Sequence, residues 1–216
     1  MTSVAATPAR GRGLAQWAGL GGIVYVVLFI VGNIVAFSGQ PDTGGPPGEI
    51  VRYYRDSGNR DQVVAGWFLV LVGVFFLLWF LASLRIFMRR IDADGFLTSL
   101  ATVGGAVYAS LALVGIGLQT AVKTMSDDTF QHQVYPGLIH AADDAGYVLH
   151  ATGGAGAAAL MIAATLAAWR AGRVPAWAGW AGVVAGVLAI FSIFFFPQIL
   201  IALWLLVAGW LLFSAR

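Results

Sequence analysis

The segment that decides the fold is 62-QVVAGWFLVLVGVFFLLWFLASLRIF-87. It contains no charged residue from Val63 to Leu84, and about twenty apolar residues in a row are enough for a helix to cross a bilayer. Backbone N–H and C=O groups find no water inside a bilayer, so a spanning segment must bond them within a helix or a closed barrel. Uninterrupted apolar runs, rather than ten-residue alternating segments, favour the helix.

The composition of the whole chain agrees with a membrane protein. Of its 216 residues, 59% are hydrophobic and only 10% are charged, whereas a soluble domain carries roughly 25% charged residues. Cysteine is absent, which excludes disulfides, thiolate metal sites, iron–sulfur clusters and cysteine nucleophiles. The net charge is +2, but the basic residues form no dense cluster, so we expect no nucleic-acid partner.

We predict an all-α fold, a polytopic six-helix bundle that forms one membrane domain over residues 1–216. The apolar stretch from Ala176 to Ser214 would be about 58 Å long as one helix, nearly twice the ~30 Å hydrocarbon core. It must therefore turn back, and Pro197 is the expected break. A short amphipathic helix is expected from Glu49 to Ser57. The predicted spans are 16–37, 62–87, 96–121, 143–169, 176–195 and 198–214, with larger loops at 38–61 and 122–142.

The basic residues orient the predicted bundle. Six spans place both termini on one side of the membrane, and loops on the cytoplasmic side carry an excess of Lys and Arg. The distribution predicts that both termini are cytoplasmic. Eight arginines lie on the side of the termini (Arg10, Arg12, Arg85, Arg89, Arg90, Arg170, Arg173, Arg216), and four basic residues lie on the other (Arg52, Arg55, Arg60, Lys123).

A weak internal repeat relates the first and third predicted helices. It is either a true repeat of helical hairpins or a convergent composition of glycine and small residues in helices that pack closely. The fifth predicted helix has a similar pattern. Gly21, Gly22, Val24, Tyr25, Leu28, Val31 and Gly32 align without gaps on Gly104, Gly105, Val107, Tyr108, Leu111, Val114 and Gly115.

The candidate functional residues lie around the start of the fourth predicted helix. His140, Asp143, Asp144, Tyr147 and His150 recur there at spacings of three and four, so they can share one helical face. Ionisable groups at the edge of an apolar span face the bundle interior, a cavity or one another.

Three further polar residues, which lie towards the same side of the membrane, are also candidates for binding a ligand or ion. Lys123 is placed to pair with Asp143 or Asp144, which fits a purely structural contact equally well, and Gln119 lies one helical turn before it. Asn33, in the first predicted helix, is expected to make an interhelical hydrogen bond.

Four interpretations of the His/Asp stripe remain open. The first is a proton or cation site, with Asp143 or Asp144 as carboxylate and His150 as the group that titrates near neutral pH. The second is a metal site with His140 and Asp144 as ligands and His150 or His132 as the third. The third is b-type haem, which would need His132 from the loop. The fourth is a structural role in capping the helix, and no cofactor is favoured.

The pattern as a whole resembles uncharacterised six-helix membrane proteins of high-GC bacteria. The resemblance rests on the Gly/Tyr-rich first helix, on Gly48 to Asp56 with its Tyr-Tyr pair, and on Val70 to Arg90 with Phe-Leu-x-Trp-Phe-Leu and Ser-Leu-Arg. Eleven arginines against one lysine fit a high-GC genome. The resemblance implies a multi-pass protein of the bacterial inner membrane. Such families have no assigned activity, so it implies no catalytic residue.

The leading hypothesis for function is non-enzymatic binding of a small ligand, ion, lipid or partner protein. The alternative is a membrane enzyme or a redox or metal protein that uses His140, Asp144 and His150. A small transporter or channel that acts as an oligomer comes third. The expected partners are membrane lipids and either a second copy of the chain or another membrane protein.

Overall fold

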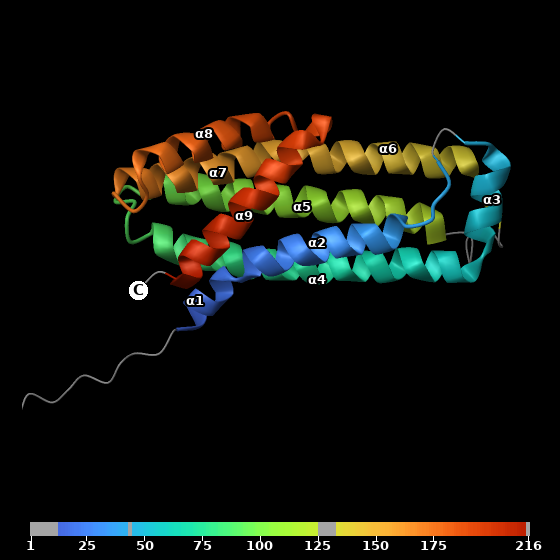
Figure 1. Ribbon diagram of the computed structural model, residues 1–216, viewed down its shortest axis with the longest axis horizontal. Helices are drawn as coiled ribbons and strands as arrows, with labels where there is room; N and C mark the ends of the chain where they lie inside the picture. The colour runs from blue at the N-terminus through green and yellow to red at the C-terminus, as the bar shows by residue number, and fades with distance from the viewer. Residues whose placement is uncertain (1–12, 43–44, 125–132, 215–216) are drawn as a thin grey trace, which may run out of the picture.

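The computed structural model describes residues 13–42, 45–124 and 133–214, and all the regular structure in them is helical (Figure 1). The elements in chain order are α1 (Leu14–Gly19), α2 (Gly21–Phe37), α3 (Pro47–Arg55), α4 (Ser57–Met88), α5 (Phe96–Thr124), α6 (Pro136–Thr152), α7 (Gly154–Arg170), α8 (Ala176–Ala189), the 3₁₀ helix η1 (Ser192–Phe194) and α9 (Phe196–Ser214).

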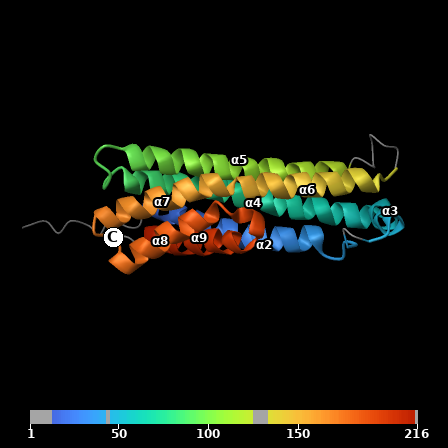
Figure 2. The same cartoon turned by 90° about the horizontal axis from the view of Figure 1, so that it is seen from above.

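The long helices run side by side and give the molecule two distinct ends. Helices α2, α4, α5 and the nearly collinear α6 and α7 form an elongated bundle, and α3 lies across one end of it (Figures 1 and 2). We call this the capped end. Helix α1 and the last turns of α9 lie at the opposite end, which we call the terminal end. Helices α8 and α9 cover only the half of the bundle nearest the terminal end.

Five helices in the described part of the chain are long and apolar enough to cross a membrane. They are Leu14–Phe37, Ser57–Met88, Phe96–Thr124, Pro136–Arg170 and Phe196–Ser214. Helix α8, at the place of the predicted fifth span, has only 14 residues, or about 21 Å of helix. At the place of the predicted fifth span there is thus a short apolar helix, too short to cross a ~30 Å core upright, whereas the predicted sixth span corresponds to α9.

The chain reverses between α8 and α9 earlier than the predicted break at Pro197. Helix α8 ends at Ala189, and the turn passes through η1 to Phe195, whose φ is 61°. Pro197 is the second residue of α9, and a proline in the first helical turn removes an N–H that has no helical partner. The proline therefore begins a helix here instead of ending one.

Three helices extend further towards the capped end than the predicted spans. Helix α4 begins at Ser57 because Asp56 caps it, accepting a hydrogen bond of 2.8 Å from the Gly58 N–H. Helix α6 begins at Pro136, a residue suited to the first helical position. Helix α4 thus has 32 residues, or about 48 Å, which exceeds the hydrocarbon core.

Glycines bring the helices into close contact. Equivalent glycines of the sequence repeat do so in two halves of the bundle, the α2–α4 pair and the α5–α6 pair. A Cβ atom on Gly66 of α4 would lie 2.5 Å from the Gly32 carbonyl oxygen of α2. A Cβ atom on Gly146 of α6 would lie 2.7 Å from the Gly115 carbonyl oxygen of α5. Gly32 and Gly115 are equivalent in the sequence repeat, so the same position of the alignment makes the close contact in the α2–α4 pair and in the α5–α6 pair.

Equivalent tyrosines meet where these two halves join. The Tyr25 hydroxyl of α2 donates a buried hydrogen bond of 2.9 Å to the Tyr108 hydroxyl of α5. The two rings are close to perpendicular, at 86°. Because Tyr25 and Tyr108 are also equivalent in the sequence repeat, this bond joins the two halves through the same residue of each.

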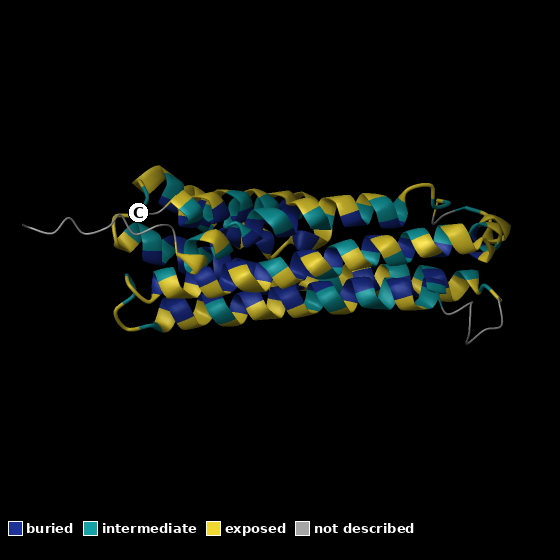
Figure 3. Ribbon diagram, turned by 90° about the horizontal axis from the view of Figure 1, so that it is seen from below, coloured by how far each residue is buried: buried dark blue, intermediate teal, exposed yellow. Residues whose placement is uncertain are grey.

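The apolar surface forms a belt of membrane thickness. Buried residues line the interior of the bundle and exposed residues cover its outside (Figure 3). Many of the exposed residues are large and apolar, and on α4 they run from Phe68 to Ile86. That stretch is about 27 Å long, close to the ~30 Å of a hydrocarbon core. The capped end of the bundle lies beyond this belt.

Candidate functional site

Helix α3 closes the capped end because it is amphipathic. Ile50 and Tyr54 are buried and pack with Val63 of α4 and Ile139 of α6. Arg52 and other charged residues of α3 remain exposed. The expected short helix is thus present, and its buried face is a small apolar cluster separate from the main core.

Arg60 ties α3 to the start of α4. Its side chain is only 6% exposed and donates hydrogen bonds to the carbonyl oxygens of Tyr54 (2.7 Å) and Arg55 (2.9 Å). These carbonyls belong to the last turn of α3, where a cation is favourable. The Tyr53 hydroxyl donates to the Ser38 carbonyl oxygen at 3.1 Å and so connects α3 to the end of α2.

Lys123 lies beneath this cap and is the centre of the candidate site. It is 1% exposed, and its ammonium nitrogen lies 2.8 Å from the Asp143 carboxylate. The ammonium also donates a hydrogen bond of 3.3 Å to the Gln40 side-chain oxygen. Since the Gln40 amide nitrogen donates to the Ala36 carbonyl oxygen at 2.7 Å, the oxygen of that amide is held towards Lys123.

Two aromatic rings complete the surroundings of the ammonium. Its nitrogen lies 4.5 Å from the centre of the Phe37 ring and 5.9 Å from the centre of the Tyr54 ring. Both distances allow a cation–π attraction. Burial and then the negative charge of Asp143 raise the pKa of Tyr54, so its phenol stays neutral. We call the Phe37, Gln40, Tyr54 and Asp143 side chains the ammonium cage.

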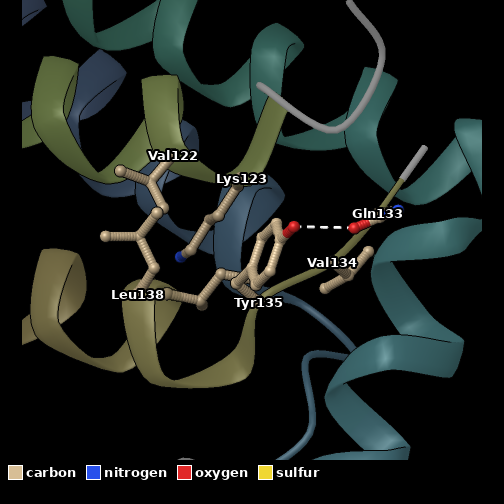
Figure 4. Close-up of a pocket in the computed structure, with 7 residues that line it drawn as sticks. Val122, Lys123, Gln133, Val134, Tyr135 and Leu138 are labelled. Atoms are coloured by element: carbon tan, nitrogen blue, oxygen red, sulfur yellow. Dashed lines mark hydrogen bonds between the residues drawn. The ribbon is translucent and has the colours of Figure 1, made fainter. Parts of the chain in front are cut away.

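A small cavity adjoins Lys123. Its volume is about 10 Å³, enough for roughly one water molecule. Figure 4 shows Lys123 beside Val122 and Leu138, and Tyr135 with its hydroxyl 2.6 Å from the Gln133 side-chain oxygen. Within the described residues, the cavity beside the ammonium is thus no larger than one water molecule.

The predicted His/Asp stripe divides between two faces of α6. Asp143 faces Lys123, and His150 stacks on Phe29 of α2 with ring centres 5.1 Å apart. Tyr147 points elsewhere and donates a hydrogen bond of 2.7 Å to the Ile193 carbonyl oxygen beside η1. Asp144 is exposed. Of the two aspartates, Asp143 is thus the one that pairs with Lys123, which the sequence left open.

The predicted metal ligands do not converge. Within the described residues, no three His, Asp or Glu side chains lie close enough together to hold a metal ion. His140 is partly buried, whereas Asp144 is exposed, and His150 packs among aromatic rings two turns further along. His132, the further ligand considered for a metal or haem, lies outside the described residues.

Gln119 and Asn33 bond to backbone. Gln119 donates from its side-chain amide to the Asp143 carbonyl oxygen at 3.1 Å, which links α5 to α6. Asn33 donates to the Phe29 carbonyl oxygen of its own helix at 2.8 Å. The interhelical hydrogen bond expected for Asn33 is therefore replaced by a bond within α2.

Sequence reasoning did not find Phe37, Gln40 and Tyr54. Phe37 is the last residue of α2, and Gln40 follows it beyond Ser38 and Gly39, outside the helix. No helical spacing therefore places Phe37 and Gln40 on a common face or indicates which other helix they meet. No family model, curated protein or solved structure matches the chain. The geometry of the capped end is therefore the basis for a functional proposal.

Proposed function

We propose that the chain is a multi-pass protein of the bacterial inner membrane, with cytoplasmic termini, that acts by binding and not by catalysis. The five apolar helices and the belt of exposed apolar side chains support membrane insertion. The described arginines at the terminal end favour the cytoplasm for that end. The capped end has four basic residues, but two of them are buried, so fewer exposed basic residues lie there. The terminal-end arginines are Arg85, Arg89, Arg90, Arg170 and Arg173, while Arg10, Arg12 and Arg216 lie outside the described residues.

The ligand that fits the capped end is a small primary ammonium ion. The observation that carries this assignment is the convergence of a carboxylate, an amide oxygen and two aromatic faces on the position of one ammonium nitrogen. Carboxylates and aromatic faces are the groups that recognise ammonium ions in proteins. In the structure, with α3 packed over the site, the side chain of Lys123 itself supplies this ammonium.

A free ammonium ligand competes with Lys123 for the cage. Gln40 is held by Ala36 and Asp143 lies on a long helix, so both acceptors keep their places when Lys123 leaves. Tyr54 belongs to α3, so displacement of the cap opens one wall of the site. Ligand entry is thereby coupled to movement of α3.

The test is to empty the cage and refill it with an external amine. Lys123→Ala removes the internal ammonium, and n-butylammonium is then added to detergent-purified protein. We expect a saturable rise in melting temperature, because the amine restores the contacts with Asp143 and Gln40. In wild-type protein we expect weaker but saturable binding by calorimetry, because the amine must displace Lys123.

Two controls decide the result. The Lys123→Ala, Asp143→Asn double variant lacks the carboxylate and should show no saturable rise with the same amine. Sodium chloride at equal ionic strength should have no effect on Lys123→Ala. An equal response of the single and double variants, or the absence of saturable binding to the wild type, would refute the proposed function.

A further inference from the structure

A second and much larger cavity lies at the terminal end. Its volume is about 280 Å³, close to the lower end of the range for ligand sites, about 300 Å³. Residues from α1, from the end of α4, from the segment after α7 and from α9 surround it. It lies at the opposite end of the bundle from the ammonium cage and is independent of the function proposed for that cage.

The inside of this cavity is largely apolar. Ile86 and Phe87 of α4 and Leu212 of α9 line it. Ser83 also lines it, but its hydroxyl already donates a hydrogen bond of 2.6 Å to the Ala15 carbonyl oxygen. The cavity therefore suits hydrocarbon better than a fully hydrated ion.

Two arginines give the cavity a positive charge. Arg90 follows α4 and Arg173 follows α7, and both are exposed residues that line the cavity. Neither forms an ion pair within the described part of the chain. Asp92 accepts hydrogen bonds from Thr98, and the cation that acts on this carboxylate is Arg170. The guanidinium groups of Arg90 and Arg173 are thus available to an external anion.

We propose that this cavity binds the headgroup of an anionic phospholipid. The phosphate lies between Arg90 and Arg173, because guanidinium groups bind phosphate oxygens in pairs. The glycerol and the first methylene groups contact Ile86, Phe87 and Leu212. A cavity of this size does not enclose two acyl chains, so the chains continue along the exposed apolar surface, where Leu14 is 72% exposed and Ile86 is 46% exposed.

The combination of charge and apolar wall selects a lipid over free phosphate. Free phosphate gains nothing from Ile86 or Leu212, whereas a phospholipid uses both parts of the site. Basic cavities between membrane helices on the cytoplasmic side bind anionic headgroups, and the proposed topology places this cavity on that side.

The experiment is a lipid titration of purified full-length protein, followed by native mass spectrometry. Phosphatidylglycerol is compared with phosphatidylcholine of the same acyl chains, and inorganic phosphate is the third probe. The test variant is Arg90→Gln, Arg173→Gln. The control variant is Arg85→Gln, Arg89→Gln, which removes the same charge from exposed residues near the same end that do not line the cavity.

We expect one phosphatidylglycerol to bind saturably and more tightly than phosphatidylcholine. The test variant should lose about 25-fold in affinity, about fivefold for each arginine, and the control variant should stay close to wild type. A third variant, Ile86→Trp, fills the apolar part and should weaken lipid binding while both arginines remain.

Three outcomes would overturn the proposal. Equal binding of the two lipids would mean that the headgroup charge is not recognised. Equal losses in the test and control variants would mean that only the general positive charge matters. Competition by inorganic phosphate at the same concentration as the lipid would assign the site to a free anion.

Discussion

Lys123 and Asp143 form an ion pair in surroundings that are largely closed to water, with side chains 1% and 15% exposed. Removal of two charges from water costs several kcal/mol for each ion, and their attraction offsets this cost only in good geometry. The pair is therefore a weak source of stability as a whole. Either charge alone, however, is strongly unfavourable at this position.

This asymmetry gives the first prediction. Asp143→Leu should lower the free energy of unfolding by about 3–5 kcal/mol, because Lys123 stays buried without its counter-ion. The Lys123→Met, Asp143→Leu double variant should recover most of this loss, since apolar side chains of similar size replace buried pairs well. The measurement is unfolding in detergent by denaturant.

Asp144→Leu is the matched control, because Asp144 is exposed on the same helix and should change stability by about 0.5 kcal/mol or less. The losses of unfolding free energy for Asp143→Leu alone and Lys123→Met alone can be added. A double variant that loses as much as this sum would show that the two charges do not act as a pair. Recovery in the double variant together with loss of amine binding would separate the structural role of the pair from its role in the proposed function.

Asp92 lies in the turn before α5 and makes the stability of the protein depend on pH. Desolvation opposes its charge, but hydrogen bonds of 2.7 Å from the Thr98 N–H and hydroxyl outweigh it and lower the pKa of Asp92 from its usual 3.8. A carboxylate with a lowered pKa contributes stability above the unfolded-state pKa. This contribution is lost as the pH falls through the folded-state pKa.

We expect Asp92→Asn to cost about 1 kcal/mol at neutral pH, as for the loss of a helix cap. The cost should shrink as the pH falls below about 4. Melting temperatures of wild type and variant across this range test it, with Asp61→Asn on exposed α4 surface as control. A difference between Asp92→Asn and wild type that stays constant with pH would contradict the assigned role.

At the scale of helices, close backbone contacts hold the two halves of the bundle in register. A Cβ atom at Gly146 would meet the Gln119 side chain at 2.5 Å and the Gly115 carbonyl oxygen at 2.7 Å. We therefore expect Gly146→Ala to destabilise the protein by about 1–3 kcal/mol through overpacking. The measurement is again the free energy of unfolding.

Gly137 lies on the same helix and provides the control. A Cβ atom there would meet nothing within 4 Å, so Gly137→Ala should be neutral or slightly stabilising, because alanine is the better helix former. A loss for Gly137→Ala equal to that for Gly146→Ala would indicate that helix propensity, and not helix contact, determines the effect.

The helices could be predicted from the sequence to the extent that they are long and apolar. The run from Val63 to Leu84 can only be a helix in a bilayer, and α4 contains it. The short α8 could not be predicted, because Ile190 to Phe195 is as apolar as a span. Its end depends on a turn in which Ser192 bonds to the Ala189 carbonyl oxygen and Phe195 has positive φ.

The candidate site was predictable only where spacing along one or two neighbouring helices decides it. The Lys123–Asp143 pair follows from two helices that adjoin the same loop. The contact of Lys123 with Gln40 joins residues 83 positions apart and depends on how α4, which packs against both α2 and α5, brings the ends of those two helices together. Side-chain chemistry alone did not separate Asp143 from Asp144, because their difference is one of helical face.

At the scale of the whole molecule, the bundle is longer than a membrane is thick. The exposed apolar belt on α4 covers about 27 Å of a helix that is about 48 Å long. The remaining turns, with α3 and the ammonium cage, lie beyond this belt, and in the proposed topology they project from one side of the bilayer. The cavity lined by Arg90 and Arg173 and most of the described arginines lie at the other end, so the molecule has two chemically different ends.

The orientation of the two ends across the membrane can be tested by labelling. The chain has no cysteine, so a single introduced cysteine is a unique site for labelling. Arg52 of α3 and Arg173 after α7 are both exposed, and they mark the capped and terminal ends. If the proposed orientation is right, a membrane-impermeant maleimide added outside the inner membrane labels Arg52→Cys and not Arg173→Cys.

Both variants should react fully after solubilisation in detergent, which controls for accessibility. Labelling of Arg173→Cys and not Arg52→Cys would place the ammonium cage in the cytoplasm and the cavity of Arg90 and Arg173 outside. That orientation would contradict the rule that basic loops stay on the cytoplasmic side. Labelling of both cysteines without detergent would mean that the chain does not separate the two compartments in one orientation. Helix α8 starts at the terminal end and α9 finishes there. The expected labelling of Arg52→Cys and Arg173→Cys is therefore the same whether or not the turn between α8 and α9 reaches the other side of the bilayer.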